Sequence, residues 1–163
     1  LSEIILHMPH VRGLGLEDNH LCGTIPTWWI LENTQLRSLY LSNNALMGPI
    51  PTEMGLLDLT SVELNGNSFA GPVPTELGRL ALYKLFLNEN TLTGPIPTEV
   101  LLIEGSMKHL NLGKNNLIGS IPSQIALLKR LETLRIDGNP LSGPIPSEIG
   151  LMSRLGIAWF NDT

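Results

Sequence analysis

Residues 36–58 read LRSLYLSNNALMGPIPTEMGLLD, and residues 59–81 read LTSVELNGNSFAGPVPTELGRLA. Both stretches follow one pattern, Leu-x-x-Leu-x-Leu-x-x-Asn-x-Leu-x-Gly-x-Ile-Pro, with Val or Phe at some apolar positions. A unit of 23 to 25 residues that returns at fixed offsets is the signature of a repeat architecture. The pattern occurs in six copies, which span 11–35, 36–58, 59–81, 82–106, 107–130 and 131–154. We interpret residues 1–10 as the tail of a preceding copy and residues 155–163 as the start of a further one.

The composition narrows the class of protein. The chain is 42% hydrophobic, which is enough to bury a core, so disorder is a poor interpretation. It carries a formal net charge of −5 and scattered positive charges, so we expect no nucleic-acid partner. One cysteine, Cys22, cannot support an internal disulfide framework. The apolar runs are far shorter than the roughly 20 residues that span a bilayer, so we expect no membrane insertion within this chain.

Each copy predicts the same local structure. Leu39 and Leu41 alternate with Ser38 and Tyr40, the period of a strand with one buried face. One such strand per copy, stacked at about 4.8 Å, makes a parallel sheet. The Thr or Ser after each Gly-x-Ile-Pro, usually followed by Glu, predicts a short helical turn with a capping hydroxyl and a favourable carboxylate. No copy can hold a core alone, so the stack must form a curved solenoid.

An asparagine follows every predicted strand, where the chain turns away from the sheet. Its amide offers both donors and an acceptor, so it can satisfy backbone groups of its own turn and of the neighbouring copy. We interpret this column as a structural ladder, which comprises Asn19, Asn44, Asn67, Asn90, Asn115 and Asn139.

The Gly-Pro extension of the pattern carries a family resemblance. The stretches LMGPIP (46–51), FAGPVP (69–74), LTGPIP (92–97) and LSGPIP (141–146) resemble the plant-type leucine-rich repeat family, which also has algal members. The resemblance covers essentially all of residues 1–163 and implies a single array. It implies an α/β repeat solenoid, a right-handed superhelix with a parallel sheet on its concave side and helical or 3-10 turns on its convex side. Neither end carries the cysteine-bearing cap that secreted members have, so we expect a piece of a longer protein.

The resemblance also implies a function. Members act as ectodomains of receptor kinases, as receptor-like proteins or as secreted inhibitors, and they present the concave or lateral face to proteins, peptides or glycans. This implies a non-enzymatic interaction module in an extracellular or secretory setting. The alternative is a structural scaffold subunit in a larger assembly, organellar or intracellular, in a photosynthetic cell. The missing caps and the scarcity of glycosylation sequons favour that alternative.

Catalytic and metal-binding patterns are absent from the sequence. Of the four histidines, His7, His10, His20 and His109, the first two are close in sequence but have no cysteine partner at metal-ligand spacing, and we interpret all four as surface residues. No serine lies in a Gly-x-Ser-x-Gly elbow, and the glycines recur at the repeat period rather than in a phosphate-binding loop. We therefore predict no enzyme, no metal and no cofactor.

The side chains that the repeat does not dictate lie on the outward positions of the concave strands. Two explanations stay open for large side chains there: packing across neighbouring strands, or a ligand surface with aromatic anchors. Neighbouring acids make part of the same face acidic, so a basic partner patch would be complementary. These acids are Glu17, Asp18, Glu63, Glu89 and Asp137. The candidate partner-binding residues are Tyr40, Glu63, Tyr83, Phe86, His109, Arg135 and Trp159.

Two further residues stand out from the repeat. Trp28 occupies the position where other copies have Glu or Gln, so it is expected on the outer side beside buried Trp29. It could pack there or contact a partner. Asn161 begins the only N-glycosylation sequon, Asn-Asp-Thr, and is a possible glycosylation site.

Overall fold

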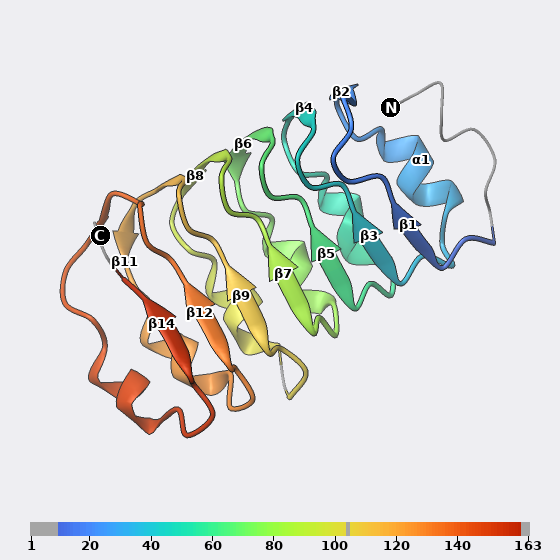
Figure 1. Cartoon of the computed structure of the whole chain (residues 1–163). Helices are drawn as coiled ribbons and strands as arrows, with labels where there is room; N and C mark the ends of the chain where they lie inside the picture. The colour runs from blue at the N-terminus through green and yellow to red at the C-terminus, as the bar shows by residue number, and fades with distance from the viewer. Residues whose placement is uncertain (1–9, 104, 161–163) are drawn as a thin grey trace.

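The computed structural model describes residues 10–103 and 105–160 as a stack of similar coils (Figure 1). The interpreted tail at 1–9 and the sequon residue Asn161 lie outside the described residues. One strand of each coil joins a seven-stranded parallel sheet, whose order follows the chain. The strands are β1 (Gly13–Gly15), β3 (Ser38–Tyr40), β5 (Ser61–Glu63), β7 (Lys84–Phe86), β9 (His109–Asn111), β12 (Thr133–Arg135) and β14 (Ile157–Trp159).

The register of this sheet keeps equivalent positions of the coils in columns. Leu39 pairs with Val62, and Tyr40 pairs with Glu63. The middle residue of each strand from β3 to β12 is buried, because side chains alternate between the two faces of a strand. The first and third residues therefore point away from the core, as the sequence predicts for a strand with one buried face.

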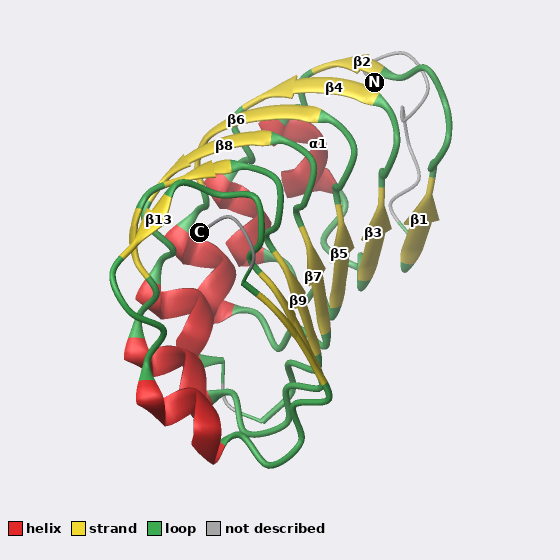
Figure 2. Cartoon of the chain, turned by 60° about the vertical axis from the view of Figure 1, so that its left-hand side comes forward, coloured by secondary structure: helices red, strands yellow, loops and turns green. Residues whose placement is uncertain are grey.

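A second sheet, which the repeat pattern did not predict, runs along another side of the coils (Figure 2). The residues before the bend are extended, with Leu46 buried between exposed Ala45 and Met47, and Gly48 ends the strand at a φ of +80°. Such short strands pair only with the adjacent coils. They are β2 (Cys22–Gly23), β4 (Ala45–Gly48), β6 (Ser68–Pro72), β8 (Thr91–Gly94) and β10 (Asn116–Leu117), with β11 (Gly119–Ser120) paired to β13 (Leu141–Ser142).

Short helices form the convex side, opposite the seven-stranded sheet (Figure 2). The expectation of a capping hydroxyl is wrong, because a proline precedes each helix and no side chain caps it. The hydroxyl lies within the first turn, where that of Thr52 donates instead to the carboxylate of Glu53 over 3.4 Å. The helices are α1 (Thr27–Glu32) and the 3-10 turns η1 (Thr52–Leu56), η2 (Thr75–Arg79), η3 (Thr98–Leu102), η4 (Ser123–Leu127) and η5 (Ser147–Leu151).

The core is one continuous cluster between the strands and the helices. The helices contribute Trp29, Met54, Leu77, Val100 and Ile125, all nearly inaccessible to solvent. Each fully buried large apolar side chain contributes about 1.5–3 kcal/mol, so a coil depends on its neighbours to cover both of its sides.

The asparagines that follow the strands form a repeated set of hydrogen bonds. The Oδ1 of Asn90 accepts the backbone N–H of Phe69 over 2.9 Å, and its Nδ2 donates to the carbonyl oxygens of Leu64 and Leu87 over 3.0 and 3.1 Å. Phe69 and Leu64 belong to the preceding coil. Asn44, Asn67, Asn115 and Asn139 make the same contacts with their own preceding coils. The amide of Asn19 is exposed and donates to Leu16 and Glu17 of its own coil.

We predict that Asn90→Ala lowers the free energy of unfolding by about 1–3 kcal/mol, because it leaves the buried N–H of Phe69 without a partner and removes one of the two amide hydrogen bonds to the Leu64 carbonyl. Equilibrium denaturation measures the loss. Asn19→Ala is the matched control at the same repeat position and should cost less than about 1 kcal/mol, since its contacts are local and exposed. Equal losses for the two variants would contradict a bridging role for Asn90.

Two glycines set how closely the convex helices stack. A Cβ at Gly55 would lie 2.5 Å from the backbone oxygen of Glu76, and one at Gly78 would clash with the backbone of Glu99. Both positions therefore require the absence of a side chain. Gly150 occupies the same repeat position in η5, and a Cβ there would meet no atom within 4 Å.

We predict that Gly55→Ala destabilises the fold by about 1–3 kcal/mol, because η1 or η2 must move to admit the methyl group. Gly150→Ala should be neutral or stabilise the fold by up to about 1 kcal/mol, since glycine is unfavourable within a helical turn. Paired thermal melts compare the two variants. A destabilisation by Gly150→Ala as large as that by Gly55→Ala would show that close stacking is not the cause.

Candidate functional site

The concave sheet presents one half-exposed column formed by the third residue of each strand. Tyr40, Glu63, Phe86 and Arg135 are partly exposed there, and Trp159 is 46% exposed on β14. By register these residues are neighbours on successive strands, with Asn111 between Phe86 and Arg135. The sequence therefore identified side chains that share one surface.

Cations cover two of the aromatic rings in this column. The Nζ of Lys84 lies 5.2 Å from the centre of the Phe86 ring and 3.0 Å from the Oε1 of Glu63. The guanidinium of Arg135 lies 4.8 Å from the centre of the Trp159 ring. A cation over an exposed ring is worth about 0.5–1 kcal/mol, so these contacts help to hold the side chains in place. They also place a ring and a charge side by side on the concave face.

Tyr83 and His109 form a second cluster on the same sheet, beside this column. Tyr83 directly precedes β7 and is 43% exposed, and its ring meets the ring of His109 edge-on at 5.3 Å between centres. The Nε2 of His109 lies 3.4 Å from the Tyr83 hydroxyl. Lys108 lies over the Tyr83 ring at 5.5 Å and pairs with Glu132 at 2.9 Å. That hydrogen bond from Lys108 lowers the pKa of Glu132, and the nearby charges of Lys108 and His109 lower it further.

The expectation of an acidic concave face is wrong across the middle of the sheet. Glu63 pairs with Lys84, and Glu89 pairs with Lys114 at 2.8 Å. Asp137 accepts from the Nε of Arg135 over 3.5 Å. Each of these acids has a neighbouring cation, so no net acidic patch remains there. The sequence could not show this, because most of the partners come from adjacent coils.

A row of left-handed residues lies at the rim, immediately before each ladder asparagine. Glu89 and Lys114 have φ of 57° and 52°, a region that non-glycine residues rarely adopt. Gly66 and Gly138 hold the same position in their coils and are the sequence signal that was missed. Next to Glu89, the Oδ1 of Asn88 is buried without a hydrogen-bond partner among the described residues. The rim therefore combines a constrained backbone with a buried acceptor that makes no hydrogen bond among the described residues.

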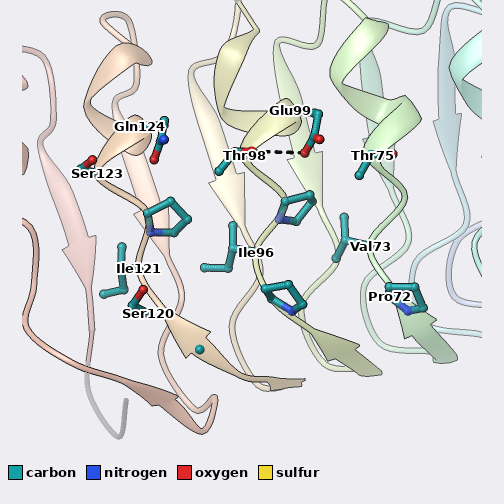
Figure 3. Close-up of a pocket in the computed structure, with 14 residues that line it drawn as sticks. Pro72, Val73, Thr75, Ile96, Thr98, Glu99, Ser120, Ile121, Ser123 and Gln124 are labelled. Carbon is teal, nitrogen blue, oxygen red and sulfur yellow. Dashed lines mark hydrogen bonds between the residues drawn. The ribbon is translucent and has the colours of Figure 1, made fainter.

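The convex flank carries a shallow groove between the second sheet and the helices. Figure 3 shows Val73, Ile96 and Ile121 of successive coils along it, with Glu99 on the helix beside them. The groove has a volume of about 740 Å³. Trp28 is on the outer side, as expected, and is 42% exposed where it lines a similar hollow of about 490 Å³ with Pro49 and Glu53. Its ring is thus partly packed and partly open to solvent.

Within residues 10–103 and 105–160, no three His, Cys, Asp or Glu side chains gather closely enough to hold a metal ion. In the same ranges, no helix has the length and apolarity needed to cross a membrane.

Comparisons with known proteins agree with the geometry. The Leucine Rich Repeat family model matches residues 35–57, 106–128 and 130–152. A search of curated protein sequences finds no significant match. Among solved structures, the chain is similar to the ectodomain of the Arabidopsis thaliana receptor kinase GASSHO1/SCHENGEN3 in complex with CASPARIAN STRIP INTEGRITY FACTOR 2. The identity is 35% and the TM-score 0.81, over 87% of this chain and 17% of that one.

Two further solved structures are similar to this chain over different shares of their own length. The plant peptide hormone receptor RGFR1, in complex with RGF2, is 35% identical with a TM-score of 0.88, over 92% of this chain and 24% of that one. A chain of the BIR3–SERK2 complex from Arabidopsis thaliana is 33% identical with a TM-score of 0.72, over 82% of this chain and 71% of that one. This chain therefore spans 17% and 24% of the two peptide-bound receptors. By its repeats, its fold and these relatives, the chain belongs to the plant-type leucine-rich repeat family.

Proposed function

We propose that this chain is a non-enzymatic module that binds a protein or peptide on its concave sheet, in an extracellular setting. The observation that carries the proposal is the column of half-exposed aromatic rings, Tyr40, Phe86 and Trp159. The repeat needs no aromatic side chain at these positions. Tryptophan, tyrosine and arginine are the residues that most often dominate binding energies at protein interfaces.

The relatives support the class of ligand. Two of the similar solved structures are plant receptors in complex with RGF2 or with CASPARIAN STRIP INTEGRITY FACTOR 2, and a third is the BIR3–SERK2 complex. A peptide or protein is therefore a better candidate than a small metabolite. An extracellular setting is supported by the receptor ectodomain among these relatives.

The geometry suggests how such a ligand is held. An apolar ligand side chain would pack on the open face of Phe86 or Trp159, while a ligand carboxylate would approach the Lys84 or Arg135 cation beside it. The existing ion pairs hold both cations in place before binding, which reduces the entropy lost on association.

We predict that a combined Tyr40→Ala, Phe86→Ala and Trp159→Ala variant loses at least about 2 kcal/mol of binding free energy, because it removes the anchoring rings. Peptides selected from a displayed random library against the native chain would be titrated against both proteins. The melting temperature should change little, since all three rings are partly exposed.

The matched control is a Met47→Ala and Ile118→Ala variant. These side chains are 51% and 53% exposed and lie on or beside the second sheet, so the selected peptides should bind it like the native chain. Selected peptides that bind the aromatic-free variant with unchanged affinity would rule out the concave column as the site.

A further inference from the structure

The convex side carries a column of exposed leucines that the fold does not require. Each occupies the same position near the end of a convex helix, five residues after the proline that precedes the helix. The column comprises Leu31, Leu56, Leu102, Leu127 and Leu151, which are 52%, 63%, 52%, 51% and 70% exposed. In the third coil Arg79 takes this place. Aligned apolar exposure of this kind marks an interaction surface more often than scattered single residues do.

A column of carboxylates runs beside the leucines. Glu53, Glu76, Glu99 and Glu148 each lie three residues before the leucine or arginine of their own helix. A 3-10 helix has three residues per turn, so residues three apart lie on the same face. Each of these turns therefore presents a carboxylate and the column residue together on the convex side that Figure 2 shows.

These carboxylates differ from those of the concave sheet in their partners. Each accepts a hydrogen bond from the hydroxyl directly before it, over 3.2 to 3.4 Å. None of the ion pairs within the described part of the chain involves them. These convex glutamates therefore have no ion-pair partner in that part of the chain, whereas acids on the concave sheet have cations next to them. The cations near the leucines are Arg79, beside Glu76 and Glu99, and Lys129 and Arg130, which line a hollow with Leu102 and Leu127. A basic partner side chain is thus favoured beside Glu53, Glu76 and Glu99, not beside Lys129 and Arg130.

The spacing of the columns suits one kind of partner. Gly55 and Gly78 allow η1, η2 and η3 to stack closely. Each coil contributes one position to each column, so neighbouring positions of a column are separated by the spacing of the coils. Coils stacked through a sheet are about 4.8 Å apart at the strands and somewhat wider on the outer side of the curve. An α-helix rises 5.4 Å per turn, so a helix that lies along the stack would offer about one turn to each coil.

We propose that this leucine–glutamate surface binds an amphipathic α-helix of a partner protein, with an apolar stripe on the leucines and Lys or Arg beside it on the glutamates. Arg79 interrupts the leucine column and would face an acidic or small residue of the partner helix, which sets its register. The surface lies on the side of the solenoid opposite the concave sheet. The inference is therefore independent of the proposed function, and the two can fail separately.

The test uses a fluorescent synthetic helix of about 18 residues, about 27 Å long, with Leu on one stripe and Lys on both flanks. We expect it to bind the native chain in an anisotropy titration and to be released as salt rises. A Leu56→Ser, Leu102→Ser and Leu127→Ser variant should bind it at least about tenfold more weakly, and so should a Glu53→Gln, Glu76→Gln and Glu99→Gln variant.

Matched controls separate this surface from other apolar exposure. A Met47→Ser and Ile118→Ser variant removes two equally exposed side chains from the second-sheet side and should bind the helix like the native chain. The variant without Tyr40, Phe86 and Trp159 should also bind it normally. Replacing the lysines of the synthetic helix by glutamates should abolish binding.

Three results would overturn the proposal. One is equal binding of the lysine and glutamate helices, which would remove the role of charge. Another is unchanged affinity in both the leucine and the glutamate variants. The third is self-association of the native chain, measured by sedimentation, that the leucine variant abolishes, because the surface would then bind a second copy of the chain.

Discussion

The hydrogen bonds of one amide side chain per coil connect each coil to the one before it. The Nδ2 of Asn115 donates to the carbonyl of Leu87 in the preceding coil, and its Oδ1 accepts the N–H of Leu92 from that same coil. A buried N–H or carbonyl without a partner costs about 1–3 kcal/mol, so a shift of one coil that broke these bonds would be penalised. The register of both sheets and the alignment of the outer columns depend on this constraint.

Because the coils stack in register, each outer position becomes a column with its own electrostatics. On the concave sheet, Lys84 and Glu63 come from neighbouring coils and neutralise each other, as do Lys108 and Glu132. On the convex helices, one column repeats the same charge, and like charges such as Glu76 and Glu99 follow each other. One architecture thus presents two surfaces of different chemistry, a concave one with aromatic rings and paired charges and a convex one with exposed leucines and carboxylates that pair with no cation among the described residues.

The sequence predicts the fold well, because the determinants of a coil lie within one copy. The alternation around Leu39 and Leu41 specifies a strand with one buried face, and the Gly-x-Ile-Pro extension specifies the turn that follows. The second sheet escaped prediction, since its strands have two to five residues and show their pairing only in the stack. The prediction of a capping hydroxyl was wrong for a local reason, because Pro51 occupies the N-cap position of η1.

The candidate site was harder to predict, because its chemistry depends on contacts between copies. The residues of the concave column followed from the period of the strand. Their charge balance did not, since Lys84 and Glu63 are 21 residues apart in sequence. The left-handed backbone of Glu89 was also hidden, because only the glycines at the equivalent position in other coils reveal it. Features that depend on one copy of the repeat can therefore be predicted from the sequence, whereas contacts between two copies cannot.

The repeated stacking has a consequence for how the molecule forms and how it can change. The asparagine hydrogen bonds between coils join residues only 21 to 28 positions apart, so their formation does not depend on distant parts of the chain. Folding can begin at any two adjacent coils and spread in both directions, as expected for a one-dimensional assembly. For the same reason, an insertion or deletion of a whole coil preserves every remaining bridge. The length of both binding surfaces is then a quantity that evolution can adjust in steps of one coil.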